Sequence, residues 1–104
     1  MNAAFLVLTT APSVKAAKSM AAALVRRKLC ACATVQGGAV SFYFWKKRLR
    51  SSREALILIK TVKRRFKALE KYLKSMHPYE LPEIIALPIA AGSKEYLQWL
   101  ESSL

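Results

Sequence analysis

The sequence predicts an α+β fold in which two helices pack on one face of an antiparallel sheet. Short apolar runs with strand character alternate with two longer segments whose apolar residues recur at helical spacing. Their order is strand, helix, strand, strand, helix, strand, and a short helical segment closes the chain. With 104 residues, 54% of them hydrophobic, the chain suits a single domain over 1–104 and is too apolar for a disordered protein.

The first strand and the first helix are predicted in the N-terminal part. Residues 3–9, AAFLVLT, form a continuous apolar run typical of a buried strand, and a turn at Pro12 ends it. Ser13 is placed to cap a helix through VKAAKSMAAALVRRK. Its expected buried stripe consists of Val14, Ala17, Ala21, Leu24 and Val25.

The middle of the chain predicts strands. Residues 29–35 have a strand pattern, which a glycine pair interrupts. The following AVSFYFW is apolar on both faces of the predicted strand. One face should therefore pack against the core, while the other needs a second surface to shield it from water. Residues 54–61, EALILIKT, are typical of a central strand buried on both faces, and RLRSSR before them is predicted to be the turn.

The clearest helix is predicted in VKRRFKALEKYLKSM, with one stripe of Phe66, Leu69, Leu73 and Met76. The His-Pro pair ends it, because a residue before proline avoids helical dihedral angles. EIIALPI is predicted to be the last strand, and SKEYLQWLESSL a closing helix capped by Ser93. The whole order is the ferredoxin-like β-α-β-β-α-β arrangement with a C-terminal helix.

The chain is strongly basic, with 18 Lys and Arg, 6 acidic residues and a net charge of +12. All its basic residues except Lys94 lie in residues 1–78, whereas four of the six glutamates lie in residues 79–104. Such a surface attracts nucleic acid and other polyanions at low salt. Non-specific polyanion or nucleic-acid binding is therefore one class of function that the sequence predicts.

The cysteines and the short apolar runs predict a cytoplasmic protein. Cys30 and Cys32 are separated by one residue, which on a strand places them on one face about 7 Å apart, too far for an unstrained disulfide. Reduced thiols indicate a reducing compartment. Apolar runs such as AAFLVL are far below the roughly 20 residues of a membrane helix, so we expect no membrane association. Residues 1–8 have no basic n-region, so we expect no signal peptide.

The residues offer candidates for three kinds of site: an RNA-binding surface, a metal site and an active site. An RNA-recognition module carries its aromatic signature on the third strand, whereas here the second strand is aromatic, so burial of Tyr43 and Trp45 against another subunit is favoured over base stacking. His77, Met76 and the two cysteines are potential copper or zinc ligands, although their spacing matches no metal motif. One histidine, no aspartate and no nucleophile motif argue against an enzyme.

Several motifs resemble the CutA family of divalent-cation tolerance proteins. They run in one register along nearly the whole chain: TTAP at 9–12, ALVRRKLCACATV, the S-x-Y-x-W of SFYFW, LIKT, HPYELPEI at 77–84, and the closing Y-x-x-W of Tyr96 and Trp99. The HPYELPEI stretch is the most specific of them. The chain is identified from these motifs as a member of that family.

The resemblance implies a ferredoxin-like subunit in a tight homotrimer whose assembly resembles that of the PII signalling proteins. Inward-facing sheets would then cover the aromatic strand. It implies a non-enzymatic role in divalent-cation tolerance, with Cu(II) or another divalent cation as ligand. The implied metal ligands are His77, Met76 and Cys32. The residues implied at a polar cleft near the subunit interface are Tyr79, Glu80, Glu83, Tyr43 and Trp45.

The chain departs from the family pattern in two respects. Thr9 and Met76 occupy positions where the enterobacterial branch has a cysteine and a histidine proposed as copper ligands. Trp45 is followed by KKRLRSSRE where an acidic, glycine-containing turn is usual. Intact motifs beside cationic faces favour a deliberately recharged, supercharged surface over a natural basic branch.

The alternative function is a cationic trimeric scaffold that binds polyanions such as nucleic acid, or assembles with acidic partners.

Overall fold

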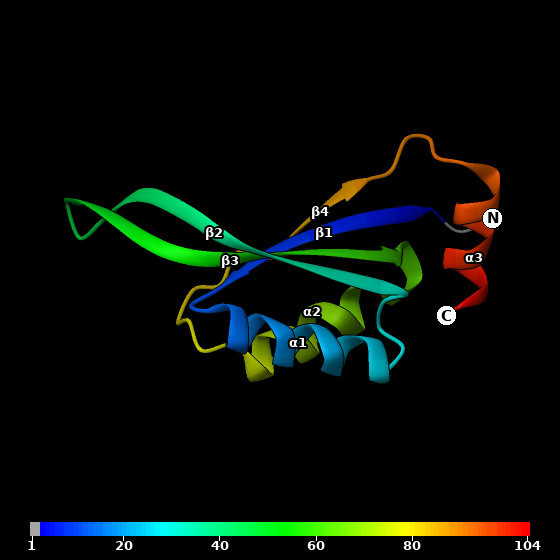
Figure 1. Cartoon of the computed structure of the whole chain (residues 1–104), viewed down its shortest axis with the longest axis horizontal. Coiled ribbons are helices and arrows are strands. Elements are labelled where there is room, and N and C mark those ends of the chain that lie inside the picture. The colour runs from blue at the N-terminus through cyan, green and yellow to red at the C-terminus, as the bar shows by residue number, and fades with distance from the viewer. Residues whose placement is uncertain (1–2) are drawn as a thin grey trace.

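A four-stranded antiparallel sheet of order β2-β3-β1-β4 forms the centre of the structure, a computed structural model that describes residues 3–104 (Figure 1). Its strands are β1 (Ala4–Ala11), β2 (Cys32–Trp45), β3 (Arg48–Val62) and β4 (Ile85–Pro88). Helices α1 (Val14–Arg26) and α2 (Phe66–Met76, after the short 3-10 turn η1, Lys63–Arg65) cover one face. Helix α3 (Lys94–Ser102) lies at the end of the sheet where β1 begins and β3 ends. The α+β prediction is confirmed.

The core lies between the sheet and the two long helices. Alternate residues of β1 and β3, such as Val7 and Ile59, pair across the strands and are fully buried. The helices supply a buried stripe of Ala17, Met20, Ala21, Leu24, Leu69 and Leu73. The predicted burial of Val14 and Val25 in the α1 stripe was wrong, because each of these residues is 41% exposed. The buried stripe runs through positions 17, 20, 21 and 24 instead.

The predicted caps at Ser13 and Ser93 and the predicted end of α2 are confirmed, whereas the predicted start of α2 at Val62 was wrong, because Val62 ends β3 and the α-helix begins at Phe66. The Ser13 hydroxyl oxygen accepts from the Ala16 N–H at 3.1 Å, and the Ser93 hydroxyl oxygen accepts from the Tyr96 N–H at 3.2 Å. Helix α2 ends at Met76, and His77 before the proline is extended, with φ −76° and ψ 133°. The chain after His77 therefore leaves the helix in a defined direction toward β4.

The β2–β3 hairpin is longer than predicted and turns at a different place. Its register runs from Cys32 opposite Lys60 to Trp45 opposite Arg48, with an irregularity between Gln36 and Ala39. The glycine pair therefore forms a bulge within one strand rather than a break. The RLRSSR turn was wrong, because the chain reverses at Lys46-Lys47 and Arg48–Arg53 still pair with β2.

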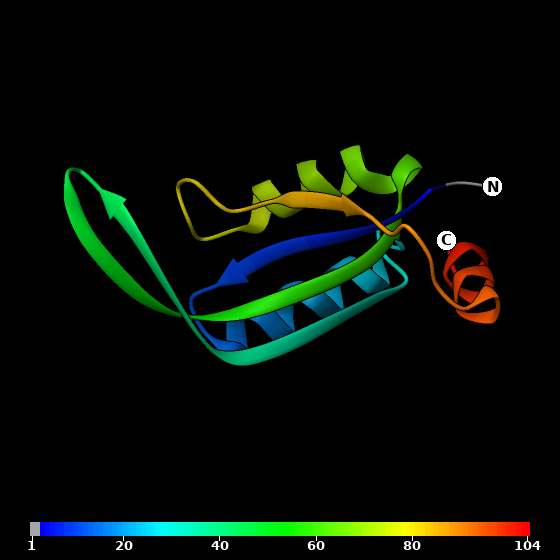
Figure 2. The ribbon, with the colours of Figure 1, turned by 90° about the horizontal axis from the view of Figure 1, so that it is seen from above.

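The sheet face opposite the helices is uncovered within this chain. Leu56 and Leu58 of β3 are only half-buried, so burial of residues 54–61 on both faces was wrong for the single chain. Leu87 of β4 is 43% exposed. The hairpin twists away beyond the helices as an arm (Figures 1 and 2), on which Phe42 and Phe44 are 72% and 74% exposed. No helix among the described residues is long and apolar enough to cross a membrane.

Candidate functional site

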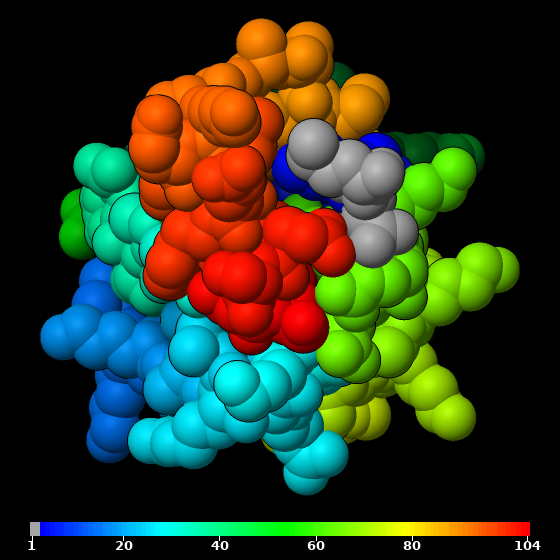
Figure 3. All heavy atoms as spheres, turned by 90° about the vertical axis from the view of Figure 1, so that its right-hand side faces the viewer, coloured from blue at the N-terminus to red at the C-terminus, as the bar shows by residue number. Residues whose placement is uncertain are grey.

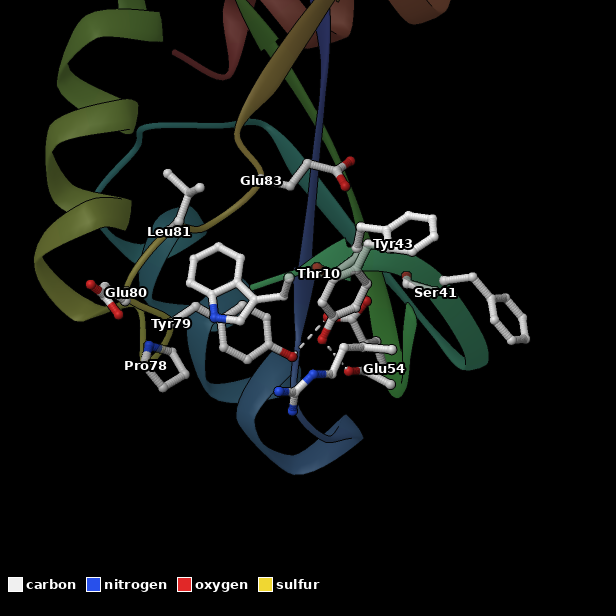
Figure 4. Close-up of a pocket in the computed structure, with 14 residues that line it drawn as sticks. Thr10, Ser41, Tyr43, Glu54, Pro78, Tyr79, Glu80, Leu81 and Glu83 are labelled. Atoms are coloured by element: carbon white, nitrogen blue, oxygen red, sulfur yellow. Dashed lines mark hydrogen bonds between the residues drawn. The ribbon is translucent and has the colours of Figure 1, made fainter. Parts of the chain in front are cut away.

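A groove of about 920 Å³ lies between the β2–β3 arm and the segment that links α2 to β4 (Figure 4). Its volume is in the range of small-molecule sites. Both walls come from segments that the sequence motifs had singled out, SFYFW and HPYELPE. The lining residues are Thr10, Ser41, Phe42, Tyr43, Phe44, Trp45, Arg50, Ser52, Glu54, Pro78, Tyr79, Glu80, Leu81 and Glu83.

Strand alternation places the polar wall of the groove. Ser41 and Tyr43 are two residues apart on β2 and point to the same face of the hairpin. Their partners on β3 are Ser52 and Arg50, so these two side chains share that face. The Tyr43 hydroxyl and the Ser52 hydroxyl lie 2.7 Å apart in a hydrogen bond. This bond joins the two strands where they form the groove.

Tyr79 connects the two walls. Its phenol donates a hydrogen bond to the Glu54 carboxylate at 2.8 Å (Figure 4). Burial raises the pKa of Glu54, but hydrogen bonds from Ser41, Tyr79 and Thr10 outweigh it and hold the pKa below its ordinary value of 4.5. Burial and the bond to Glu54 both raise the pKa of Tyr79. The pair therefore stays a phenol and a carboxylate at neutral pH.

His77 anchors the start of the linking segment. Its Nδ1 accepts the backbone N–H of Tyr79 at 3.1 Å, so Nε2 carries the proton and donates to the Thr10 carbonyl oxygen at 2.8 Å. The Thr9 hydroxyl lies 3.5 Å from the same Nε2, and the rings of His77 and Tyr79 are 4.9 Å apart. Both imidazole nitrogens are thus engaged, and neither offers a lone pair to a metal.

The three residues predicted as metal ligands do not converge. His77 and Met76 are consecutive, but Met76 packs against the core while the imidazole faces Thr10. Cys32 is opposite Lys60, six positions along β3 from Glu54, which at about 3.3 Å per residue is roughly 20 Å away. Residues 3–104 contain no group of three His, Cys, Asp or Glu side chains that could hold a metal. The copper set does not fit this geometry.

The groove gathers acidic residues in a chain that has few of them. Three of the six acidic residues, Glu54, Glu80 and Glu83, line it. Figure 4 shows that Glu80 and Glu83 point away from the Glu54 carboxylate rather than toward one common point. The carboxylates form an acidic rim around the groove, with Arg50 as the only basic lining residue.

The structure brings together all five residues predicted for the cleft, namely Tyr79, Glu80, Glu83, Tyr43 and Trp45. Sequence reasoning missed Glu54, although it is one of only two acidic residues in positions 1–78. Its position as an isolated acid inside a basic segment was a signal that could have identified it. Ser41, Ser52 and Thr10 have no such signal, because small polar residues are ordinary on strands.

A comparison with family models identifies the relationship. Residues 5–103 match the model of the CutA1 divalent ion tolerance protein. The chain belongs to the CutA1 family. The CutA protein of Thermus thermophilus is 43% identical over 97 residues, covering 93% of this chain and 94% of that protein. The CutA protein of Escherichia coli is 42% identical over 103 residues, covering 99% and 92%.

Solved CutA structures have the same fold. CutA from Xylella fastidiosa superposes with a TM-score of 0.93 at 36% identity, covering 96% of each chain. CutA1 from Oryza sativa gives 0.95 at 36% identity, covering 98% of this chain and 94% of that one. The resemblance on which the HPYELPEI and SFYFW motifs were interpreted is thus confirmed, and the groove lies between these two CutA1 motifs.

Proposed function

We propose that this protein acts in divalent-cation tolerance as a homotrimer and binds divalent cations at the rim of the groove. The observation that carries the proposal is the gathering of Glu54, Glu80 and Glu83 at one groove of a chain with a net charge of +12. Carboxylate oxygens with completing waters suit hard divalent cations. Because one chain gathers no three-ligand group among its described residues, ligands from a second subunit or from water would complete the shell.

The uncovered sheet face supports the homotrimer. It presents Leu6, Leu8, Leu56, Leu58, Ile85 and Leu87, all half-buried or exposed in one chain. A contiguous apolar face of this kind is typical of subunit interfaces. Inward-facing sheets would bury it together with the aromatic arm and would place the groove beside a neighbouring subunit.

The groove is suited to binding rather than to catalysis. General acid–base catalysis works best with a pKa near the operating pH. Here the pKa of Glu54 is lowered and the pKa of Tyr79 is raised, so both move away from neutrality. We therefore propose a non-enzymatic role. Copper as the specific ion and a cytoplasmic location stay predictions.

Native mass spectrometry with Mn(II) and Cu(II) tests the proposal. A three-chain assembly that takes up whole numbers of cations, and loses them in Glu80→Gln/Glu83→Gln, is the expected result. Glu70→Gln/Glu95→Gln is the matched control, because it removes two carboxylates that do not line the groove. His77→Gln tests the imidazole separately. Cation uptake lost only in the His77 variant would instead mean that the imidazole turns away from Thr10 to bind metal. Equal uptake by all variants would exclude the groove, and uptake by none would exclude cation binding.

The alternative function, polyanion binding, involves a different surface. The groove is acidic, whereas eleven of the 18 basic residues lie in residues 14–28 and 63–76. The two functions can therefore be tested separately.

A further inference from the structure

Residues 14–28 and 63–76, which contain α1, η1, α2 and the two residues after α1, carry most of the positive charge of the chain. Helices α1 and α2 form a layer on one face of the sheet (Figure 1). Residues 14–28 and 63–76 contain eleven Lys and Arg and one acid, Glu70, which is +10 of the total +12. All eleven are exposed except Arg65, which is half-buried. We call them the helix-layer cations: Lys15, Lys18, Arg26, Arg27, Lys28, Lys63, Arg64, Arg65, Lys67, Lys71 and Lys74.

Little of this charge is neutralised within the described part of the chain. The ion pairs there are Lys74–Glu70 at 3.3 Å and Arg64–Glu101 at 3.2 Å. The first turns of α1 and α2 contain no acidic residue. Figure 3 shows long side chains of the blue-to-cyan and yellow-green segments extending outward from the molecule. Uncompensated like charges repel one another, so this layer favours an anionic partner.

We propose that the helix-layer cations bind the phosphate backbone of duplex nucleic acid without reading its sequence. Helix α1 has 13 residues, so it is about 20 Å long at roughly 1.5 Å per residue. Duplex DNA carries about one negative charge per 1.7 Å, so roughly 12 phosphates lie along that length. This number is comparable with the charge of +10 on residues 14–28 and 63–76.

The side chains of the layer suit backbone contacts rather than base recognition. The aromatic residues of α2 are already engaged: Phe66 packs edge-on against Phe5, with ring centres 6.2 Å apart, and the Arg27 guanidinium lies 4.2 Å from the centre of the Tyr72 ring. They are therefore not available to stack on bases. Lysine and arginine contacts to phosphates carry no sequence information, so we infer binding that depends on charge and length alone.

An anionic membrane surface is the weaker candidate for the same charge. A helix that binds in the membrane interface inserts an apolar face among the acyl chains. The apolar faces of α1 and α2 are occupied, because Leu24 and Leu69 are fully buried against the sheet. Among large apolar residues of these helices, Val14 and Val25 are exposed, at 41% each. The helix layer therefore has surface charge but no exposed apolar face that could insert into a membrane.

The helix layer is also independent of the groove. It lies on the face of the sheet opposite the uncovered one, and no helix-layer cation lines the groove. If the uncovered sheet faces pack inward in an assembly, the helices remain outside and free to contact a duplex. Loss of nucleic-acid binding would therefore leave cation uptake unchanged, and the reverse also holds.

Fluorescence anisotropy with mixed-sequence DNA and RNA duplexes of about 20 base pairs tests this inference. The helix variant is Lys15→Gln/Lys18→Gln/Lys67→Gln/Lys71→Gln. The control variant is Lys46→Asn/Lys47→Asn/Arg48→Gln/Lys94→Gln, which changes exposed cations outside the helix layer. Both have a net charge of +8, four less than +12. We expect the helix variant to bind roughly tenfold or more weakly with a shallower salt dependence, and the control to bind close to wild type.

Equal weakening of both variants would overturn the proposal, because net charge rather than the helix layer would then explain binding. A binding affinity that does not change with salt concentration would also overturn the proposal. Vesicles containing phosphatidylserine form a third arm, and stronger binding to them than to either duplex would assign the layer to membranes instead. A preference for DNA or RNA would identify the source of the phosphates and would support the proposal.

Discussion

At the scale of single residues, the Tyr79–Glu54 hydrogen bond defines the groove. We predict that Tyr79→Phe raises the pKa of Glu54, because the carboxylate loses one of the three hydrogen bonds that offset its burial. A carbon-13 NMR titration of the glutamate side chains measures the shift. Ser52→Ala is the control, since that hydroxyl bonds Tyr43 instead. An unchanged Glu54 titration in Tyr79→Phe would mean that Ser41 and Thr10 suffice.

The same carboxylate makes stability depend on pH in the acid range. The folded-state pKa of Glu54 lies below its ordinary value of 4.5, so its contribution is fully present above that value. It is lost as the pH falls through the folded-state pKa. We predict that Glu54→Gln flattens the decline of unfolding free energy in this range, as measured by urea denaturation at several pH values. Glu95→Gln, at an exposed residue of α3, should leave the decline unchanged.

Cys30 illustrates how burial controls reactivity. Only 2% of the residue is exposed, and burial, followed by the neighbouring Cys32, raises the pKa of its thiol to about 12. The thiolate is the reactive form, so we predict that native Cys32→Ser protein resists iodoacetamide at neutral pH. Mass spectrometry with and without denaturant measures the modification. Rapid labelling of the folded variant would show that the segment around Cys30, just before β2, opens readily.

At the scale of elements, the hairpin turn is a site of backbone strain. Lys46 and Lys47 have φ values of 51° and 64°, a region that is disfavoured for residues other than Gly, Asn and Asp. We predict that Lys46→Asn/Lys47→Gly increases the unfolding free energy by about 1 kcal/mol. Lys46→Gln/Lys47→Gln is the matched control, since it removes the same charges but retains the strain. An equal gain in both variants would assign the effect to charge.

The order and types of the elements could be predicted because each has a local signal. Ser13 and Ser93 marked helix starts, and the His77-Pro78 pair marked a helix end, and all three depend on chemistry within a few residues. The turn at Lys46-Lys47 could not be predicted, because neither residue is one that turns favour. Cross-strand pairing of the arm outweighs the local cost there.

The candidate site was predictable in part for the same reason. Motifs on two separate segments marked Tyr43 and Tyr79, but only the register between β2 and β3 places Glu54 beside them. The hydrogen bonds of His77 also depend on β1, 67 residues away for Thr10, and no local pattern predicts them. The sequence therefore allowed a copper ligand set of His77, Met76 and Cys32, whereas the tertiary contacts within one chain keep these side chains apart.

At the scale of the whole molecule, the acidic groove and the basic helices lie on different parts of one small body with principal extents of 45 × 25 × 23 Å. At about 0.01 M salt the screening length is roughly 30 Å, so the helix-layer cations all repel one another. At about 0.15 M it falls to roughly 8 Å, shorter than either helix. The charge distribution thus destabilises the fold most at low ionic strength.

We therefore predict that the melting temperature rises as sodium chloride increases over this range, as measured by differential scanning calorimetry. Screening removes more repulsion than attraction, because only two ion pairs oppose a charge of +12 in the described chain. The helix variant, with +6 instead of +10 on the layer, should melt higher at low salt and respond less to added salt. A melting temperature that falls with salt would mean that attraction dominates, and that the helix-layer cations are paired more fully than Glu70 and Glu101 allow.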